Sequence, residues 1–200
     1  MYKDNIYTIP NLLCVSRAAA SPFVAHLILA GRNTEAFGLL FVAGLTDLFD
    51  GMIARRWPSQ ASRFGTALDP VCDKILMTTV VVAETSVGML PWQLAAVMIG
   101  RDVGLVLGGF WYRYLSLAPP VTLHKFFDGS HGATEFHPTM LGKVNTCLQL
   151  LLIGSSLVYP LLGLETLVPM VAFQYLVGST TVLSGLQYVT SNTAVQLHKR

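Results

Sequence analysis

Asp47, Asp50, Asp69 and Asp73 lie in one short stretch of a chain in which only 12% of the residues are charged. The first two are three positions apart and the last two are four apart, so on helices each pair shares one face. Carboxylates with no histidine or cysteine among them suit a hard divalent cation such as Mg²⁺, Mn²⁺ or Ca²⁺ rather than Zn²⁺. The pattern therefore predicts a site for one or two divalent ions.

The residues beside these aspartates are suited to a phosphate ligand. Gly51 and Ala54 continue the stripe of the first pair and are small, and Gly65 likewise lets a ligand approach the backbone closely. Arg55, on the adjoining turn, can present a fork of donors to phosphate. Carboxylates, cations and an arginine together indicate a site for a diphosphate.

The chain that must position these residues has the composition of an integral membrane protein. Its 200 residues are 52% hydrophobic, with a mean hydropathy of +0.54. Mostly apolar stretches of about 20 residues are long enough to cross a bilayer. Six such stretches are present, at 9–30, 35–54, 69–89, 92–114, 140–162 and 167–190. We therefore predict an all-α fold of six transmembrane helices that forms a single domain over residues 1–200.

The ends of the second and third stretches should bring the aspartates together. Asp69 is a good N-cap and Pro70 fits the first helical position, where its missing N–H is harmless. The third helix is therefore predicted to begin at this point. The chain would leave one helix, cross a short loop and start another, with both aspartate pairs near the same membrane face.

The positions of the basic residues agree with six spans. Six spans place both termini on one side, together with the long segment 115–139, which we expect to be a surface loop or a short interfacial helix. Nearly all basic residues outside the spans then fall on that side, whereas the other side carries Arg32. This asymmetry is the positive-inside pattern. The aspartates are accordingly predicted on the cytoplasm-like or matrix-like face.

Charge and cysteine content limit the classes of function. The formal net charge of +2 is small and the basic residues form no solvated run, so we expect no nucleic-acid partner. Cys14, Cys72 and Cys147 are odd in number and set in apolar surroundings, and we interpret them as packing residues. Aspartates inside membrane helices also occur in ion-coupled transporters, and the residues alone leave that alternative open.

The spacing Asp-x2-Asp-Gly-x2-Ala-Arg-x9-Gly-x3-Asp-x3-Asp resembles the signature of the CDP-alcohol phosphatidyltransferases. The resemblance implies a fold of six transmembrane helices, usually dimeric, with a cavity at the membrane interface. It implies that Asp47, Asp50 and Asp69 hold divalent ions and the CDP diphosphate. Asp73 would complete the metal site and act as the base that accepts a proton from the attacking alcohol. On this resemblance the transporter becomes a distant alternative.

Five longer segments look like the CMP-forming cardiolipin synthases of mitochondria. They are "TIPNLLCVSRAAASP", "AGLTDLFDGMIAR", "ALDPVCDKILM", "GRDVGLVLGGFWYRY" and "GKVNTCLQLLLI". The resemblance implies transfer of a phosphatidyl group from CDP-diacylglycerol to phosphatidylglycerol, with release of CMP. It also implies the mitochondrial inner membrane with the site facing the matrix, or a bacterial inner membrane with the site facing the cytoplasm. Phosphatidylglycerophosphate synthases, which use glycerol 3-phosphate as acceptor, share the core signature and are the alternative.

Further residues are candidates for the two lipid substrates. Thr46 and Asn11 are assigned to the nucleotide, although Asn11 could merely cap the first helix. Both lipids are anionic, which gives a role to basic residues in or near the spans. The candidates for the acceptor lipid are Arg17, Arg101, Lys143, His124 and Lys125.

Three further features of the sequence have more than one interpretation. Arg101 and Asp102 could form a self-neutralising pair that ties helices together instead of binding substrate. Lys74 could be a structural partner of the acidic cluster. No Arg- and Ser-rich leader precedes the first span in this sequence, so we expect either a mature form or a membrane that needs no import signal.

Overall fold

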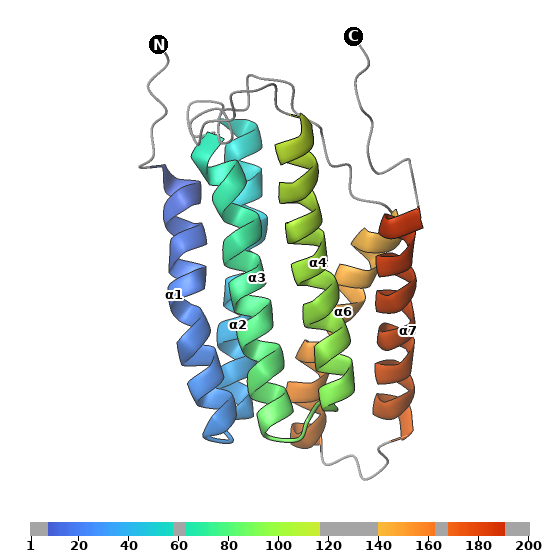
Figure 1. The fold of residues 1–200 in the computed structure, drawn as a ribbon. Coiled ribbons are helices and arrows are strands. Elements are labelled where there is room, and N and C mark those ends of the chain that lie inside the picture. The colour runs from blue at the N-terminus through green and yellow to red at the C-terminus, as the bar shows by residue number, and fades with distance from the viewer. Residues whose placement is uncertain (1–7, 58–62, 117–139, 163–167, 191–200) are drawn as a thin grey trace.

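The computed structural model is a bundle of α-helices (Figure 1). It describes residues 8–57, 63–116, 140–162 and 168–190, and the side chains in these ranges other than those of 54–55, 63–70, 110, 112–113, 115–116 and 188–190. The described elements are α1 (Ile9–Leu29), α2 (Asn33–Arg56), α3 (Arg63–Ser86), α4 (Trp92–Ser116), α6 (Met140–Val158), the 3₁₀ helix η2 (Tyr159–Leu162) and α7 (Val168–Thr190). These ranges contain no strand, so the all-α prediction is confirmed for the described part of the chain.

The helix ends agree with the sequence except in α3, which begins six residues and ends three residues before the predicted 69–89. Counting η2 with α6, five of the six predicted stretches match to within two residues at each end. The predicted start at Asp69 is wrong, because α3 begins at Arg63 and Pro70 lies inside the helix. Proline removes one helical hydrogen bond, but a helix that starts earlier satisfies the other backbone groups of this apolar segment. Asp69 is therefore not an N-cap.

Three of the described helices are long and apolar enough to cross a bilayer. They are Ile9–Leu29, Asn33–Ile53 and Met140–Leu162. Their outward surfaces carry large apolar side chains, among them Leu12, Phe23 and Leu151, which are 70%, 66% and 56% exposed. An apolar surface of this extent marks contact with lipid rather than water. The chain is thus an integral membrane protein.

The buried apolar residues gather in one half of the bundle. Examples are Val24, Leu40, Val80, Leu94 and Leu152, all at most 7% exposed. They come from the end of α1, the start of α2, the later part of α3, the start of α4 and the later part of α6. Figure 1 shows these segments at the lower end of the bundle. The other half contains the charged residues that the sequence singles out.

Tight turns close the apolar end of the bundle. The α1–α2 and α3–α4 turns contain Gly31 at φ 72° and Gly88 at φ 78°, a backbone conformation that favours glycine. After the first of these, the Arg32 N–H donates to the Leu27 carbonyl at 2.9 Å, which is a Schellman arrangement. Both hairpins are antiparallel, so the end of α2 and the start of α3 lie at the opposite end of the bundle, near the start of α1 (Figure 1).

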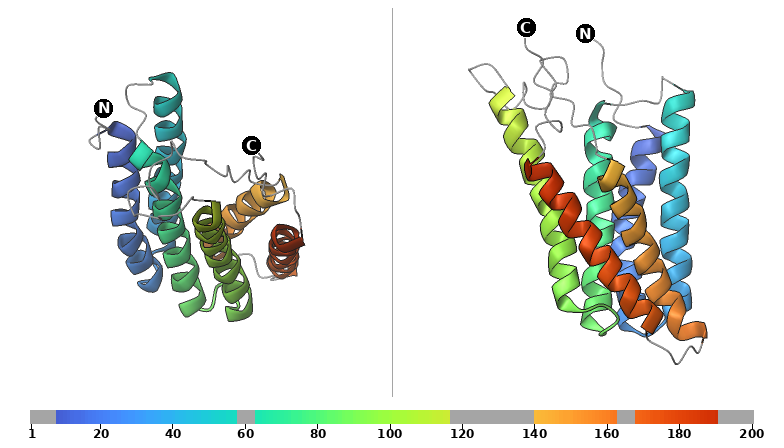
Figure 2. Two further views of the ribbon diagram at one scale, coloured as in Figure 1. Left: turned by 45° about the horizontal axis from the view of Figure 1, so that its top comes forward. Right: turned by 90° about the vertical axis from the view of Figure 1, so that its right-hand side faces the viewer.

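The helices pack in two groups, which α3 connects together with a contact between α2 and α6. α1 contacts α2 and α3, α7 contacts α4 and α6, and α3 also contacts α4 and α6. Figure 2 shows α7 on the side of the bundle away from α1. Hydrogen bonds link α6 to α7: Asn145 Oδ1 accepts from the hydroxyls of Thr180 and Thr181, both at 2.9 Å. Polar contacts of this kind hold membrane helices together.

A proline interrupts the hydrogen-bond ladder of α1 just below Arg17. Pro22 has no N–H to donate to the carbonyl of Ala18, four residues earlier. The Ser21 hydroxyl donates to that carbonyl instead, at 2.8 Å. The carbonyl is therefore satisfied although the helical bond is missing.

The free cysteines lie in two environments. Cys14 and Cys72 are buried, as the packing interpretation predicts. Cys147 is exposed, so the interpretation is wrong for this residue. In a membrane chain, apolar neighbours in the sequence do not distinguish a core position from one that faces lipid.

Candidate active site

The guanidinium of Arg17 is the centre of a cluster of aspartates from two other helices. Its Nη1 contacts Oδ1 of Asp47 and lies 2.9 Å from Oδ1 of Asp73. Its Nη2 lies 2.5 Å from Oδ2 of Asp50. Arg17 belongs to α1, the first two aspartates to α2 and Asp73 to α3. The structure thus brings together three of the four aspartates that the sequence assigns to one site.

This acidic cluster is closed on one side and open on the other. The side chains of Arg17 and Asp50 are only 2% and 5% exposed. The side chains of Asp47 and Asp73 are 48% and 39% exposed. A buried guanidinium needs partners because an unpaired buried charge is costly, and the carboxylates provide them. A ligand can reach the cluster at the open side, where Asp47 and Asp73 lie.

The open side has carboxylate oxygens that could be ligands of a divalent cation. One oxygen of Asp47 and one of Asp73 meet at a single point, the Nη1 atom of Arg17. Carboxylate oxygens are the ligands that Mg²⁺ and Mn²⁺ prefer. Among the described side chains, no three acidic, histidine or cysteine residues already form a metal cage. Asp69, the fourth predicted ligand, is described only in its backbone.

A second charged cluster continues from Asp73 through its neighbour in the chain. Lys74 Nζ lies 2.5 Å from Oδ2 of Asp102, and Arg101 Nη1 lies 2.8 Å from Oδ1 of the same carboxylate. Arg101 Nη2 also donates to the Ser184 hydroxyl of α7 at 3.1 Å. Two cations share one carboxylate, so this basic cluster has a formal charge of +1.

These contacts change two interpretations of the sequence. Lys74 is predicted to partner the acidic cluster, yet its ion pair is with Asp102 of α4. Arg17 is predicted to bind the acceptor lipid, but the structure places it against the aspartates. An arginine within a membrane helix needs acidic partners nearby. This requirement could have predicted the pairing of Arg17 with the aspartates from the sequence. The Arg101–Asp102 pair forms as the sequence suggests.

The other predicted residues lie around the acidic cluster or outside the described side chains. The Thr46 hydroxyl donates to the carbonyl three residues earlier at 2.7 Å. Asn11 is buried, and the cap of α1 is Thr8, whose hydroxyl accepts from the Asn11 N–H at 3.5 Å. Gly51 follows Asp50 in α2, and Lys143 is exposed in the first turn of α6. The side chains of Ala54, Arg55, Gly65, Asp69, His124 and Lys125 lie outside those described.

Removing the carboxylate from the basic cluster should destabilise the protein. Asp102→Asn leaves Lys74 and Arg101 without their shared partner, and we expect a loss of about 3 kcal/mol in the free energy of unfolding. Equilibrium unfolding in mixed micelles measures this change. Glu35→Gln is the matched control, because Glu35 pairs with Arg32 at the surface, where an ion pair contributes about 0–1 kcal/mol. Equal losses in both variants would show that the basic cluster is not stabilising.

Comparison with known proteins finds relatives that are named as cardiolipin synthases. The chain is 45% identical to a probable CMP-forming cardiolipin synthase of Drosophila melanogaster, over 94% of this chain and 58% of the relative. It is 41% identical to the CMP-forming cardiolipin synthase of Rattus norvegicus, over 78% and 52%. It is 37% identical to the enzyme of that name from Homo sapiens, over 92% and 62%. The chain thus spans little more than half the length of these relatives.

The family comparison covers the acidic cluster and the basic cluster together. The model of the CDP-alcohol phosphatidyltransferase family matches residues 7–186, a range that holds every described residue of both clusters. The signature over Asp47 to Asp73 is also the part of the chain that brings the carboxylates around one point. The chain belongs to the CDP-alcohol phosphatidyltransferase family.

Proposed function

We propose that this chain is a CMP-forming cardiolipin synthase, which transfers a phosphatidyl group from CDP-diacylglycerol to phosphatidylglycerol. The observation that carries the proposal is that partly exposed carboxylates from α2 and α3 meet at one guanidinium nitrogen, in a chain of this family. The relatives that match most of this chain and bear that name support the choice of lipids.

The proposed reaction breaks a phosphoanhydride bond and forms a phosphoester bond. The terminal glycerol hydroxyl of phosphatidylglycerol attacks the phosphorus that carries diacylglycerol, and the bond from this phosphorus to CMP breaks. Asp73 accepts the hydroxyl proton, since an alkyl hydroxyl is a poor nucleophile without a base. Its place on the open side, with one oxygen held 2.9 Å from Arg17, suits it to this task. A bound divalent ion would offset the charge on the phosphoryl oxygens and on the departing CMP.

The residues of the signature would share the remaining tasks. We assign one or two Mg²⁺ or Mn²⁺ ions to Asp47, Asp50, Asp69 and Asp73. The CDP moiety would lie against the same stripe of α2 and the start of α3. Its further contacts would come from Thr46, Gly51, Ala54, Arg55, Gly65 and Asn11.

The proposal includes a placement in the membrane. Residues 1–200 would form one catalytic domain with six membrane-spanning helices, because α3, α4 and α7 also expose apolar side chains such as Val82, Leu107 and Leu186. The resemblance to mitochondrial enzymes favours the mitochondrial inner membrane with the site facing the matrix. A bacterial inner membrane with the site facing the cytoplasm is the alternative. We expect a homodimer, as is usual in this family.

An acceptor assay tests the proposed function. Purified protein with CDP-diacylglycerol and phosphatidylglycerol should form cardiolipin and CMP in equal amounts. EDTA should stop the reaction, and Mg²⁺ or Mn²⁺ should restore it, because the carboxylates and the diphosphate are both negative and need a cation between them. Thin-layer chromatography of labelled lipids measures the products. Formation of phosphatidylglycerophosphate from glycerol 3-phosphate, without cardiolipin from phosphatidylglycerol, would identify the alternative enzyme.

A further inference from the structure

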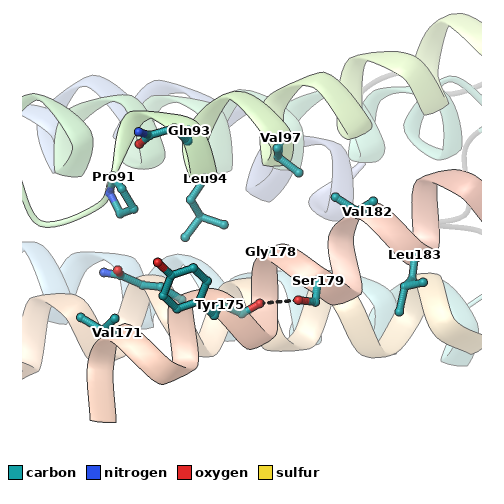
Figure 3. A pocket seen from close by; sticks show the side chains of 11 residues that line it. Pro91, Gln93, Leu94, Val97, Val171, Tyr175, Gly178, Ser179, Val182 and Leu183 are labelled. Carbon is teal, nitrogen blue, oxygen red and sulfur yellow. Dashed lines mark hydrogen bonds between the residues drawn. The ribbon is translucent and has the colours of Figure 1, made fainter. Parts of the chain in front are cut away.

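An apolar groove lies between α4 and α7, next to the basic cluster. Its volume is about 900 Å³. Leu94 and Val97 project into it from α4, whereas Gly178, Val182 and Leu183 line it from α7 (Figure 3). The polar groups of Gln93, Gln174 and Tyr175 lie toward the end of the groove that is nearer the tight turns. The remainder of the lining is mostly aliphatic.

The shape of the groove suits an alkyl chain. Its α7 lining runs from Val171 to Leu183, which is roughly 18 Å of helix at 1.5 Å per residue. The hydrocarbon of one bilayer leaflet is about 15 Å thick. A Cβ added at Gly178 would lie 3.4 Å from Leu94 Cδ1, so this glycine lets the two helices meet without closing the groove.

The end of the groove nearer the acidic cluster is cationic. Arg101 is the next residue along the α4 stripe after Val97, four positions on. Its Cγ lies 3.8 Å from the place of a Cβ at Gly185, so the stem packs on α7 above the groove. The Arg101 side chain is only 6% exposed, and its Nε is buried without a hydrogen-bond partner. A donor in this state favours an acceptor oxygen from a ligand.

We propose that the groove holds one acyl chain of an anionic phospholipid whose phosphate binds at Arg101 and Lys74. The inference rests on the proposed function and identifies this lipid as the acceptor, phosphatidylglycerol. Lys74 follows Asp73 in the chain, so a phosphate at this cluster brings the headgroup hydroxyl toward the base.

The charges of the two clusters indicate which substrate each one binds. One guanidinium against three carboxylates gives the acidic cluster a formal charge of −2, which attracts cations and through them a diphosphate. The basic cluster has a formal charge of +1 and attracts a phosphate directly. The stripe of α4 that lines the groove continues to Arg101 of the basic cluster. The acceptor lipid, rather than CDP-diacylglycerol, is therefore the occupant of the groove.

Filling the groove should weaken binding of the acceptor lipid. Val182→Trp places an indole in the groove, and we expect it to raise the KM for dioleoyl phosphatidylglycerol about tenfold, as lost packing contacts reduce affinity. The rise should be smaller with dihexanoyl phosphatidylglycerol, whose chains do not fill the groove. Leu176→Trp is the matched control, because Leu176 is also on α7 and does not line the groove. Leu176 is 51% exposed and Val182 is 47% exposed. An equal effect of both variants, or of Val182→Trp on both lipids, would overturn the inference.

A cross-linking experiment tests the groove independently of turnover. Phosphatidylglycerol with a photoactivatable acyl chain should label α4 and α7 peptides of the wild-type protein, and Val182→Trp should abolish this labelling. Equal labelling by phosphatidylethanolamine with the same chain would contradict the role of Arg101 and Lys74. A change of oligomeric state in Val182→Trp, seen by native mass spectrometry, would instead make the groove a subunit interface. Labelling without any cardiolipin synthesis would refute the proposed function and leave the lipid site intact.

Discussion

Replacing Asp73 with asparagine is expected to lower the rate of cardiolipin formation by about 10²–10⁴-fold, the usual contribution of a general base. The asparagine has nearly the same shape, and its carbonyl oxygen can still accept from Nη1 of Arg17, which lies 2.9 Å from the native carboxylate. The cluster should therefore keep its geometry: the amide oxygen remains as a neutral ligand for a divalent ion, and the proton acceptor is lost. Binding of CDP-diacylglycerol, measured by titration calorimetry without acceptor, should be largely retained.

Asp50→Asn provides the comparison for this experiment. The Asp50 side chain is 5% exposed and lies on the closed side of the acidic cluster, where it cannot reach an acceptor hydroxyl as readily as Asp73 can. We expect this variant to weaken metal-dependent binding of the nucleotide as well as turnover. An equal loss of nucleotide binding in both variants would argue against a separate base at Asp73.

Replacing Arg17 with methionine should lower the free energy of unfolding by about 3–5 kcal/mol when divalent ions are absent. The variant removes the cation that the three aspartates share, and with it the ion pair of the nearly buried Asp50 carboxylate. Mn²⁺ should stabilise the variant more than the wild type, because an ion that binds only the folded cluster takes over the missing charge. Equilibrium unfolding in mixed micelles, with EDTA or with Mn²⁺, measures both effects.

Two further variants make this result specific. Arg32→Met removes the partner of Glu35 at the surface and should cost at most about 1 kcal/mol. Arg17→Lys keeps the charge but loses the guanidinium fork, so its stability should fall between the wild type and Arg17→Met. A higher KM for phosphatidylglycerol in Arg17→Met, with unchanged stability, would instead support the lipid-binding role that the sequence suggests for Arg17.

The sequence was sufficient to predict the helices and the stripe of aspartates. Apolar stretches of membrane length have few alternative structures, because each backbone group must be satisfied within the segment. The start of α3 was missed because Asp69 and Pro70 form a good local helix start, whereas the structure continues the helix back to Arg63. Capping rules consider only the residues of one helical turn. They do not include the need of a whole membrane span to satisfy its backbone groups.

The partners of the charged residues could not be predicted from spacing. Asp47 and Asp50 share a helix, so their common face follows from the helical period. Their pairing with Arg17 depends on how α1 packs against α2, and the sequence does not give the rotation of one helix relative to another. Lys74 illustrates the same limit, because it directly follows Asp73 in the chain and yet forms its ion pair with Asp102 of α4.

Pro22 has a consequence for how α1 can adapt. A helix bends most readily where its ladder is interrupted, and the interruption falls at Ala18, immediately after Arg17. Beyond it, Val24 and Ile28 are fully buried and anchor the remainder of the helix. A change in the bend of α1 at this point would therefore move the Arg17 guanidinium relative to α2 and α3, while the buried segment after it stayed in place. The spacing between Arg17 and the carboxylates of the acidic cluster would then be set by a single flexible point in α1.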